Sequence, residues 1–169
     1  MHGVVLRPLG QPGDLGWVVQ AHGELYAREF GWDATFERSA AEVLLGFLRD
    51  HDPAREAGWI AEVDGARAGS IVCVRTGDEA VAKLRVLLVH PDARGRGVGR
   101  VLVDTCIAFA RDAGYQHLEL WTVDVLVSAR RIYDAAGFRL VDEEPRRELF
   151  GAQLVGQTLA LDLTAPTAH

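Results

Sequence analysis

The spacing of apolar residues changes several times along the chain, and these changes predict a mixed α/β fold. Apolar positions three and four residues apart predict helices that follow Asp14 and Asp33, and two more over Val98–Ala113 and Val127–Ala136. The resulting order, β-α-α-β-β-β-α-β-α-β-β, is typical of a mixed sheet with helices on its faces. Strand-like apolar runs are expected at residues 3–9, 58–63, 68–75, 81–89, 117–122, 138–142 and 157–163.

Turn and cap residues support these boundaries. Asp14 and Asp33 are expected to cap the helices that follow them, because their side chains can accept hydrogen bonds from free N–H groups. Asp64-Gly65 is a typical two-residue hairpin turn, and Gly114 and Gly137 are expected to end the last two helices. The second helix is expected to bury one side, which carries Phe36, Ala40, Leu44, Phe47 and Leu48.

Length and composition fit one globular domain. The 169 residues are 49% hydrophobic and contain no linker or repeat, so we expect a single domain over residues 1–169, with its core in residues 3–163 and a frayed tail at 164–169. No apolar stretch approaches the ~20 residues of a membrane helix, and the N-terminus has no signal-peptide pattern, so we expect a cytoplasmic protein. Cys73 and Cys106 lie in apolar patterns, which favours reduced core thiols over a disulfide or a metal site.

The charge balance narrows the class of ligand. A net charge of −6 argues against nucleic-acid binding, which depends on broad phosphate neutralisation by Lys and Arg. Local arginine clusters suit a small polyanionic ligand, although each cluster alone is also typical of a solvated helix face. These clusters are Arg94, Arg96 and Arg100; Arg130 and Arg131; and Arg146 and Arg147.

A glycine-rich segment, Arg94-Gly95-Arg96-Gly97-Val98-Gly99, joins the apolar run 84–89 to a helix. Backbone N–H groups at such a helix start can bind a phosphate, and the alternative is an ordinary strand-to-helix turn. The string Gly-x4-Gly-Lys-Ser/Thr is absent, which excludes a P-loop. The dinucleotide fingerprint would need a glycine at position 100, where Arg100 stands.

Two motifs together resemble the GCN5-related N-acetyltransferase (GNAT) family. The first is the segment Arg94–Gly99, which matches Arg/Gln-x-x-Gly-x-Gly/Ala, and the second is Ala129-x-x-x-Tyr133 followed by Gly137-Phe138. The resemblance implies the GNAT fold, with two central strands that splay apart. Residues 12–17, 22–26 and 29–37 further resemble the acetyltransferase half of bacterial MarR–GNAT fusions; the winged-helix half has no counterpart here, so we expect no DNA-binding role.

The same resemblance implies acetyl-CoA as cofactor, CoA as product and no metal. Pantetheine would follow the backbone before the glycine segment, and the pyrophosphate would lie over the N–H groups at the start of the helix, where glycines allow close approach and the helix dipole favours an anion. Leu126 stands where many members carry an Asn that contacts the cofactor. The expected cofactor-binding residues are Leu87, Leu88, Val89, Arg94, Gly95, Arg96, Gly97, Val98, Gly99 and Arg100.

Acyl transfer to an amine needs an acid, a base and a group that stabilises the oxyanion. Tyr133 matches the family's tyrosine and is our candidate acid for the leaving thiolate; the alternative is a packing aromatic. A backbone N–H near Leu88 or Val89 is the candidate oxyanion donor. The base is less defined, since an amine of pKa about 10.4 arrives protonated. Glu24 and Glu37 are preferred among His22, Glu24, Glu29 and Glu37, with a solvated helix carboxylate or a water relay as alternatives.

The acceptor pocket is expected in the N-terminal half. Trp17, Tyr26, Trp32 and Trp59 are candidates to line it or to pack in the core, and Arg85 is placed to meet an acidic acceptor or to be an exposed strand arginine. We therefore predict an acetyl-CoA-dependent N-acyltransferase that acts by direct transfer to a primary amine of a small molecule or protein. The alternative is a catalytically silent acyl-CoA sensor. A homodimer is common in the family, but nothing in the sequence specifies one.

Overall fold

The computed structural model describes residues 3–166, and its elements follow the predicted order. Most boundaries agree with the sequence prediction within two residues, and the mixed α/β class is confirmed. A short hairpin of two strands near the C-terminus was not predicted. The elements are β1 (Val4–Pro8), α1 (Asp14–Phe30), α2 (Ala34–Arg49), β2 (Ala57–Val63), β3 (Ala66–Arg75), β4 (Val81–Val89), the 3-10 turn η1 (Pro91–Ala93), α3 (Val98–Asp112), β5 (His117–Val123), α4 (Val127–Ala136), β6 (Arg139–Glu143), β7 (Arg147–Leu149), β8 (Ala152–Leu154) and β9 (Gly156–Asp162).

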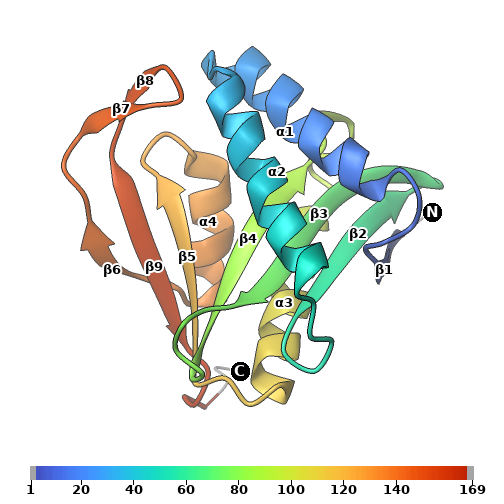
Figure 1. Cartoon of the computed structure of the whole chain (residues 1–169), viewed down its shortest axis with the longest axis vertical. Coiled ribbons are helices and arrows are strands. Elements are labelled where there is room, and N and C mark those ends of the chain that lie inside the picture. Colours follow the sequence, from blue (N-terminus) through green and yellow to red (C-terminus); the bar gives the residue numbers. More distant parts are fainter. Residues whose placement is uncertain (1–2, 167–169) are drawn as a thin grey trace.

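Seven strands form one sheet in the order β1-β2-β3-β4-β5-β9-β6, and β7 and β8 pair separately. Only β4 and β5 of this sheet run parallel; the other neighbours are antiparallel. Helices α1 and α2 cover one face, and α3 and α4 cover the other (Figure 1). The larger core lies between the sheet and α3, around Leu102, Cys106 and Leu118, and a second lies beneath α1 and α2.

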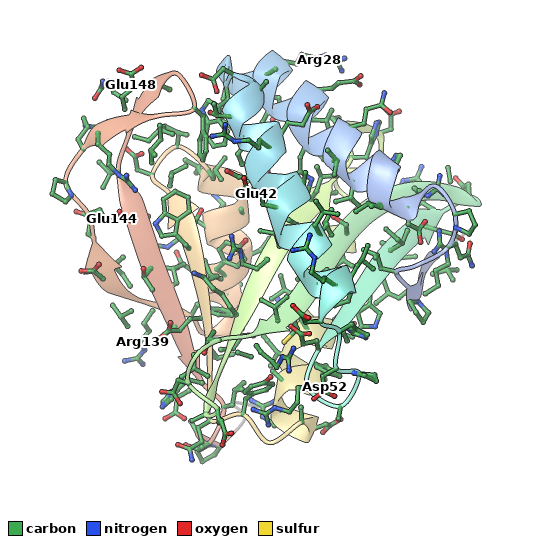
Figure 2. The ribbon with its side chains drawn as sticks, in the orientation of Figure 1. Arg28, Glu42, Asp52, Arg139, Glu144 and Glu148 are labelled. Carbon is green, nitrogen blue, oxygen red and sulfur yellow. The ribbon has the colours of Figure 1, made fainter. Side chains whose placement is uncertain are left out.

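Helix α2 shows how the apolar pattern becomes burial. The Asp33 carboxylate accepts a hydrogen bond from the Thr35 N–H at 3.0 Å, which confirms the predicted cap. Leu44 and Phe47 pack against the sheet, but Leu48 is 44% exposed. Its expected burial was wrong, because residue 48 lies about 100° around the helix from residue 47. The outer face is charged, and Glu42 points away from the sheet (Figure 2).

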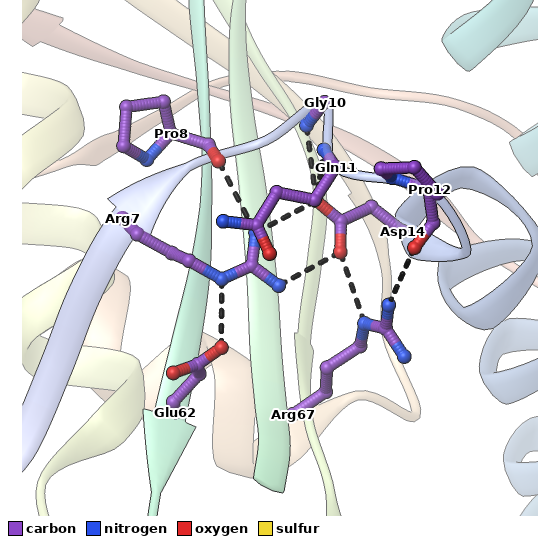
Figure 3. Close-up of polar contacts among 8 residues, drawn as sticks. All are labelled: Arg7, Pro8, Gly10, Gln11, Pro12, Asp14, Glu62 and Arg67. Carbon is purple, nitrogen blue, oxygen red and sulfur yellow. Dashed lines mark hydrogen bonds and ion pairs between the residues drawn. The ribbon is translucent and has the colours of Figure 1, made fainter. Parts of the chain in front are cut away.

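Asp14 does not cap α1 as predicted. Its carboxylate is fully buried and accepts two hydrogen bonds from Arg7 at 2.8 Å, one from Arg67 Nε at 2.9 Å, and others from two backbone N–H groups of the preceding turn (Figure 3). These bonds, the Arg7 pair first among them, hold the pKa of Asp14 well below its usual value. Arg7 also pairs with Glu62 at 2.7 Å. The cluster therefore joins β1, β2 and β3 to the first turn of α1.

Smaller expectations are also settled in the described residues. Asp64 and Gly65 have φ values of 54° and 80° and form the predicted turn between β2 and β3. Cys73 and Cys106 are buried free thiols, as predicted. Within residues 3–166, no helix combines the length and apolar character needed to cross a bilayer. The predicted frayed tail, residues 164–169, lies in part outside the described residues.

Candidate active site

A bulge in β4 separates the two parallel strands at the centre of the sheet. Val86 has φ 49°, an unusual conformation for a β-branched residue, and the β3–β4 register shifts between Ser70 and Val72. The Ser70 hydroxyl donates to the Val86 carbonyl at 2.8 Å and so holds the bulge. As a result β4 pairs with β5 only over Val81–Lys83, and beyond this point the strands are not hydrogen-bonded to each other.

A large cavity of about 590 Å³ opens beside the end of β4. Leu87, Leu88 and Val89 line one side, the glycine segment lines the second, and α1 and the start of α4 complete it. Gly95 and Gly97 have φ values of 79° and 75°, which favour glycine, and no atom would contact a β-carbon at either position. The open space above them leaves room for a ligand.

The start of α3 provides free N–H groups at this cavity. The first N–H that bonds back into the helix is that of Val101, to the Gly97 carbonyl at 3.1 Å, so the N–H groups of Val98, Gly99 and Arg100 have no partner within the helix. Such a helix start attracts an anion. At Gly99 the reason for glycine differs from our prediction: a β-carbon there would lie 2.6 Å from Ile132 Cδ1 of α4, so this glycine lets two helices pack.

The two arginines of the glycine segment and Arg100 of α3 have different roles. Arg94 lines the large cavity and pairs across it with Glu29 of α1. Arg100 also lines the cavity and pairs with Asp104 at 3.1 Å. The Arg96 side chain turns away and pairs with Asp64 at 3.5 Å, so of the predicted binding residues it alone does not line the cavity.

A small cavity of about 200 Å³ lies between the α1–α2 pair and the separated strands. It shares Tyr26, Leu87, Leu126 and Ala129 with the large cavity, so the two cavities meet where β4 leaves β5. Its walls are aromatic, with Tyr26, Trp32, Phe36, Trp121 and Phe150.

Four aromatic residues were expected to line an acceptor pocket, and two of them, Tyr26 and Trp32, line the small cavity. Trp17 of α1 packs instead against the core between α1, α2 and the sheet, and Trp59 packs edge-on against Phe109 at 5.7 Å. Phe150 reaches the cavity from the β7–β8 hairpin, where its carbonyl accepts a bond from the Asp33 N–H at 2.9 Å. The two strands of that hairpin are three residues each, and no alternation of apolar residues predicts them.

Tyr133 lies on α4 in the wall of the small cavity, with only 6% of its surface exposed. Its ring packs against Phe138 at 5.8 Å, and its hydroxyl has no hydrogen-bond partner among the described residues. Burial, with a smaller effect from Tyr26, raises the pKa of this phenol. Tyr133 is therefore protonated at neutral pH, and the same burial makes its phenol a weaker acid than a free tyrosine.

His22 of α1 lines the same cavity and is almost fully buried. Its Nδ1 lies 2.8 Å from the Val18 carbonyl, which can only accept, so Nδ1 carries the hydrogen and Nε2 has a free lone pair. Burial lowers the pKa of His22 to about 4, so the ring is neutral at pH 7. The sequence named His22 as a candidate base, but did not prefer it.

The two preferred carboxylates lie outside both cavities. Glu24 lies two residues after His22, which is about 200° around α1, so its side chain is exposed and points away from the cavity. Its carboxylate accepts a hydrogen bond from the Gln20 side chain at 3.0 Å. Glu37 turns toward α1, where its carboxylate lies over Gly23, a position at which any β-carbon would collide with it. Within residues 3–166, no three His, Cys, Asp or Glu side chains gather closely enough to hold a metal ion.

This arrangement defines a class of protein. A parallel strand pair that separates at a bulge, with a glycine-rich helix start beside it and a buried tyrosine on the helix that follows β5, is the framework of an acyl-CoA-dependent transferase. The chain belongs to the acetyltransferase (GNAT) family, whose model matches residues 19–138. Members of this family are acyl-CoA-dependent N-acetyltransferases, and this chain is one of them.

Individual relatives and a solved structure to which the chain is similar are also acetyltransferases by name. The chain is 30% identical over 118 residues to an uncharacterised N-acetyltransferase of Schizosaccharomyces pombe, a match that covers 69% of this chain and 72% of that protein. Human N-acetyltransferase 8B is 32% identical over 85 residues, 48% of this chain, and the match spans only 37% of that protein. The structure of yncA from Salmonella typhimurium, which contains its cofactor acetyl-CoA, has a similar fold, with a TM-score of 0.76, 17% identity and coverage of 99% and 98% of the two chains. None of these matches supports the finer resemblance to MarR fusions.

Proposed function

We propose that the chain transfers an acetyl group from acetyl-CoA directly to a primary amine, with both substrates bound at once. The observation that carries this proposal is the meeting of the two cavities at Leu87 and Leu126, beside Tyr133. The large cavity would hold the donor, and the small one the amine.

The residues of the large cavity fit the donor. Pantetheine would follow the backbone of Leu87–Val89, which borders the cavity beyond the bulge. The pyrophosphate would meet the free N–H groups of Val98, Gly99 and Arg100, with Arg94 at the rim. When bound, the thioester supplies an activated acetyl group. Arg96 contributes only its backbone to this proposal, because its side chain pairs with Asp64.

Three groups of the chain serve the transfer. The protonated amine first releases one proton to solvent. The C–S bond then breaks as the C–N bond forms, the nitrogen loses its second proton, and the leaving thiolate gains one. Tyr133 gives the proton to sulfur, a backbone N–H near Leu88 or Val89 stabilises charge on the acetyl oxygen, and His22 Nε2 takes the proton of the amine. His22 replaces Glu24 and Glu37 in this role because it alone of the three lines the small cavity.

The proposal is tested by turnover of the wild type and of Tyr133→Phe, with acetyl-CoA and a panel of primary amines, followed as free thiol. We expect kcat of the variant to fall about a hundredfold or more, with CoA affinity unchanged. Tyr115→Phe is the matched control, since Tyr115 is also buried but bonds to the Arg55 carbonyl outside both cavities. Undiminished turnover of Tyr133→Phe would exclude the acid role. CoA binding without acetylation of any amine would favour the silent sensor instead.

A further inference from the structure

The small cavity contains one strongly basic side chain and no acidic one. Arg85 of β4 lines this cavity, and its guanidinium makes no hydrogen bond or ion pair with a described residue. Glu119 on β5 is the strand partner of Lys83, and its negative charge favours the charged form of Lys83 rather than that of Arg85. Burial lowers the pKa of Arg85, and no neighbouring carboxylate offsets the effect. A partly buried cation without a counter-charge is costly to the fold, which indicates that its partner is a ligand.

Thr122 of β5 is a second polar residue of the lining without a partner, but it does not lie beside Arg85. It is 4% exposed, and its hydroxyl is the one buried side-chain polar atom in the described residues without a hydrogen bond. Side chains alternate along a strand, so Thr122 lies with Leu118 and Leu120 on the face that α3 and α4 cover. Arg85 follows Leu84 of the same core and therefore lies on the opposite face, toward α1 and α2.

The rest of the cavity limits the size and kind of its occupant. A volume of about 200 Å³ admits a small molecule rather than a folded segment, and the aromatic walls suit an apolar body. Ser39 of α2 and His22 of α1 are the other polar groups of the α1–α2 wall. The amine must lie near the boundary with the large cavity, where Tyr133 lies.

We propose that the acceptor is a small amine that also carries a carboxylate, that is, a free amino acid with an apolar side chain or a close analogue. Arg85 binds the carboxylate through its planar fork, and the aromatic walls hold the side chain. This inference rests on the proposed function, because it names the substrate class of the same site.

The experiment compares phenylalanine, leucine and methionine with their carboxamides, which keep the amine and lose the negative charge. We expect the wild type to prefer the acids by at least tenfold in kcat/KM, since a charge-assisted bond is replaced by a neutral one. Arg85→Gln should bring the acid-to-amide ratio close to one. Arg139→Gln is the matched control, because Arg139 is an exposed arginine of β6, at the lower end of the sheet (Figure 2), and it should keep the wild-type ratio.

Thermal unfolding in the presence of CoA separates this inference from the proposed function. Acids that raise the midpoint more than amides do, and lose this advantage in Arg85→Gln, support the carboxylate site even if no amine is acetylated. Equal shifts for acids and amides, or none for either, would overturn it, and so would an undiminished ratio in Arg85→Gln.

Discussion

His22 lies beneath the α1–α2 pair, with its ring 5.9 Å from those of Tyr26 and Phe36 and its Nδ1 bonded to Val18. Burial among these rings deprives a charged imidazole of most of its hydration, so the neutral form is the stable one. The same surroundings make Nε2 the one nitrogen that a substrate can meet. A histidine of ordinary pKa would be partly protonated at pH 6.5, and His22 is not.

The low pKa of His22 has a consequence for stability. The ring binds a proton near pH 6.5 in the unfolded chain but only near pH 4 in the fold, so the unfolded state takes up more protons as the pH falls between these values. The contribution is fully present above pH 6.5 and is lost by pH 4, and amounts to roughly 3 kcal/mol. Denaturant unfolding of the wild type and of His22→Gln at pH 7, 5.5 and 4 measures it. The wild type should lose stability relative to the variant as pH falls; a constant difference would show that His22 has an ordinary pKa.

The sequence predicted which types of residue lie near the site better than it predicted which side chains point into the cavities. Tyr133 and the residues Leu87–Val89 reach the cavities, because a motif and a strand end define their positions. Glu24 and His22 stand on one helix, and only the side that α1 turns to the sheet decides between them. The sequence left two interpretations for Arg85, and the structure shows that it lines the small cavity. The neighbouring bulge at Val86 could not be predicted, because the residue with positive φ is not a glycine.

The glycine segment combines a loop and a helix start that need glycine for two reasons. Gly95 and Gly97 adopt left-handed backbone conformations beside open space, and Gly99 lies in the contact between α3 and α4. A sequence of alternating glycines does not distinguish the two, since both are typical of a tight turn into a helix.

A paired substitution tests the packing role of Gly99. Gly99→Ala places a methyl group against Ile132 Cδ1 and should cost about 1–3 kcal/mol in the free energy of unfolding. Ile132→Val removes that atom, so the double variant should recover part of the loss relative to the two single variants. Chemical denaturation of the four proteins gives the coupling energy. Strictly additive effects would show that Gly99 and Ile132 do not compete for space.

At the scale of the whole molecule, the order of strands and helices was predictable wherever the spacing of apolar residues is regular. Seven sheet strands and four helices were expected from apolar spacing, and all of them except the exposed strand β6 bury at least part of one side against a neighbour. The Asp14 cluster and the β7–β8 hairpin were not predictable, because their partners are far apart in the sequence: Arg67 is 53 residues from Asp14, and Phe150 reaches Asp33 across the domain. The small cavity takes residues from α1, α2, β4, β5, α4 and this hairpin, so only the folded chain could define it.

Thermal unfolding with acetyl-CoA, CoA and ATP, each added separately, tests whether the large cavity is a CoA site. Ligand at about 100 times its dissociation constant adds about 2.7 kcal/mol to the free energy of unfolding, which is a clear shift in midpoint. We predict stabilisation by acetyl-CoA and CoA and none by ATP, because pantetheine follows Leu87–Val89 while the pyrophosphate meets the start of α3. Equal stabilisation by ATP would show a general nucleotide site rather than a CoA site. No shift with either CoA compound would mean that the glycine segment is only a turn, and either result would contradict the assignment of the donor site.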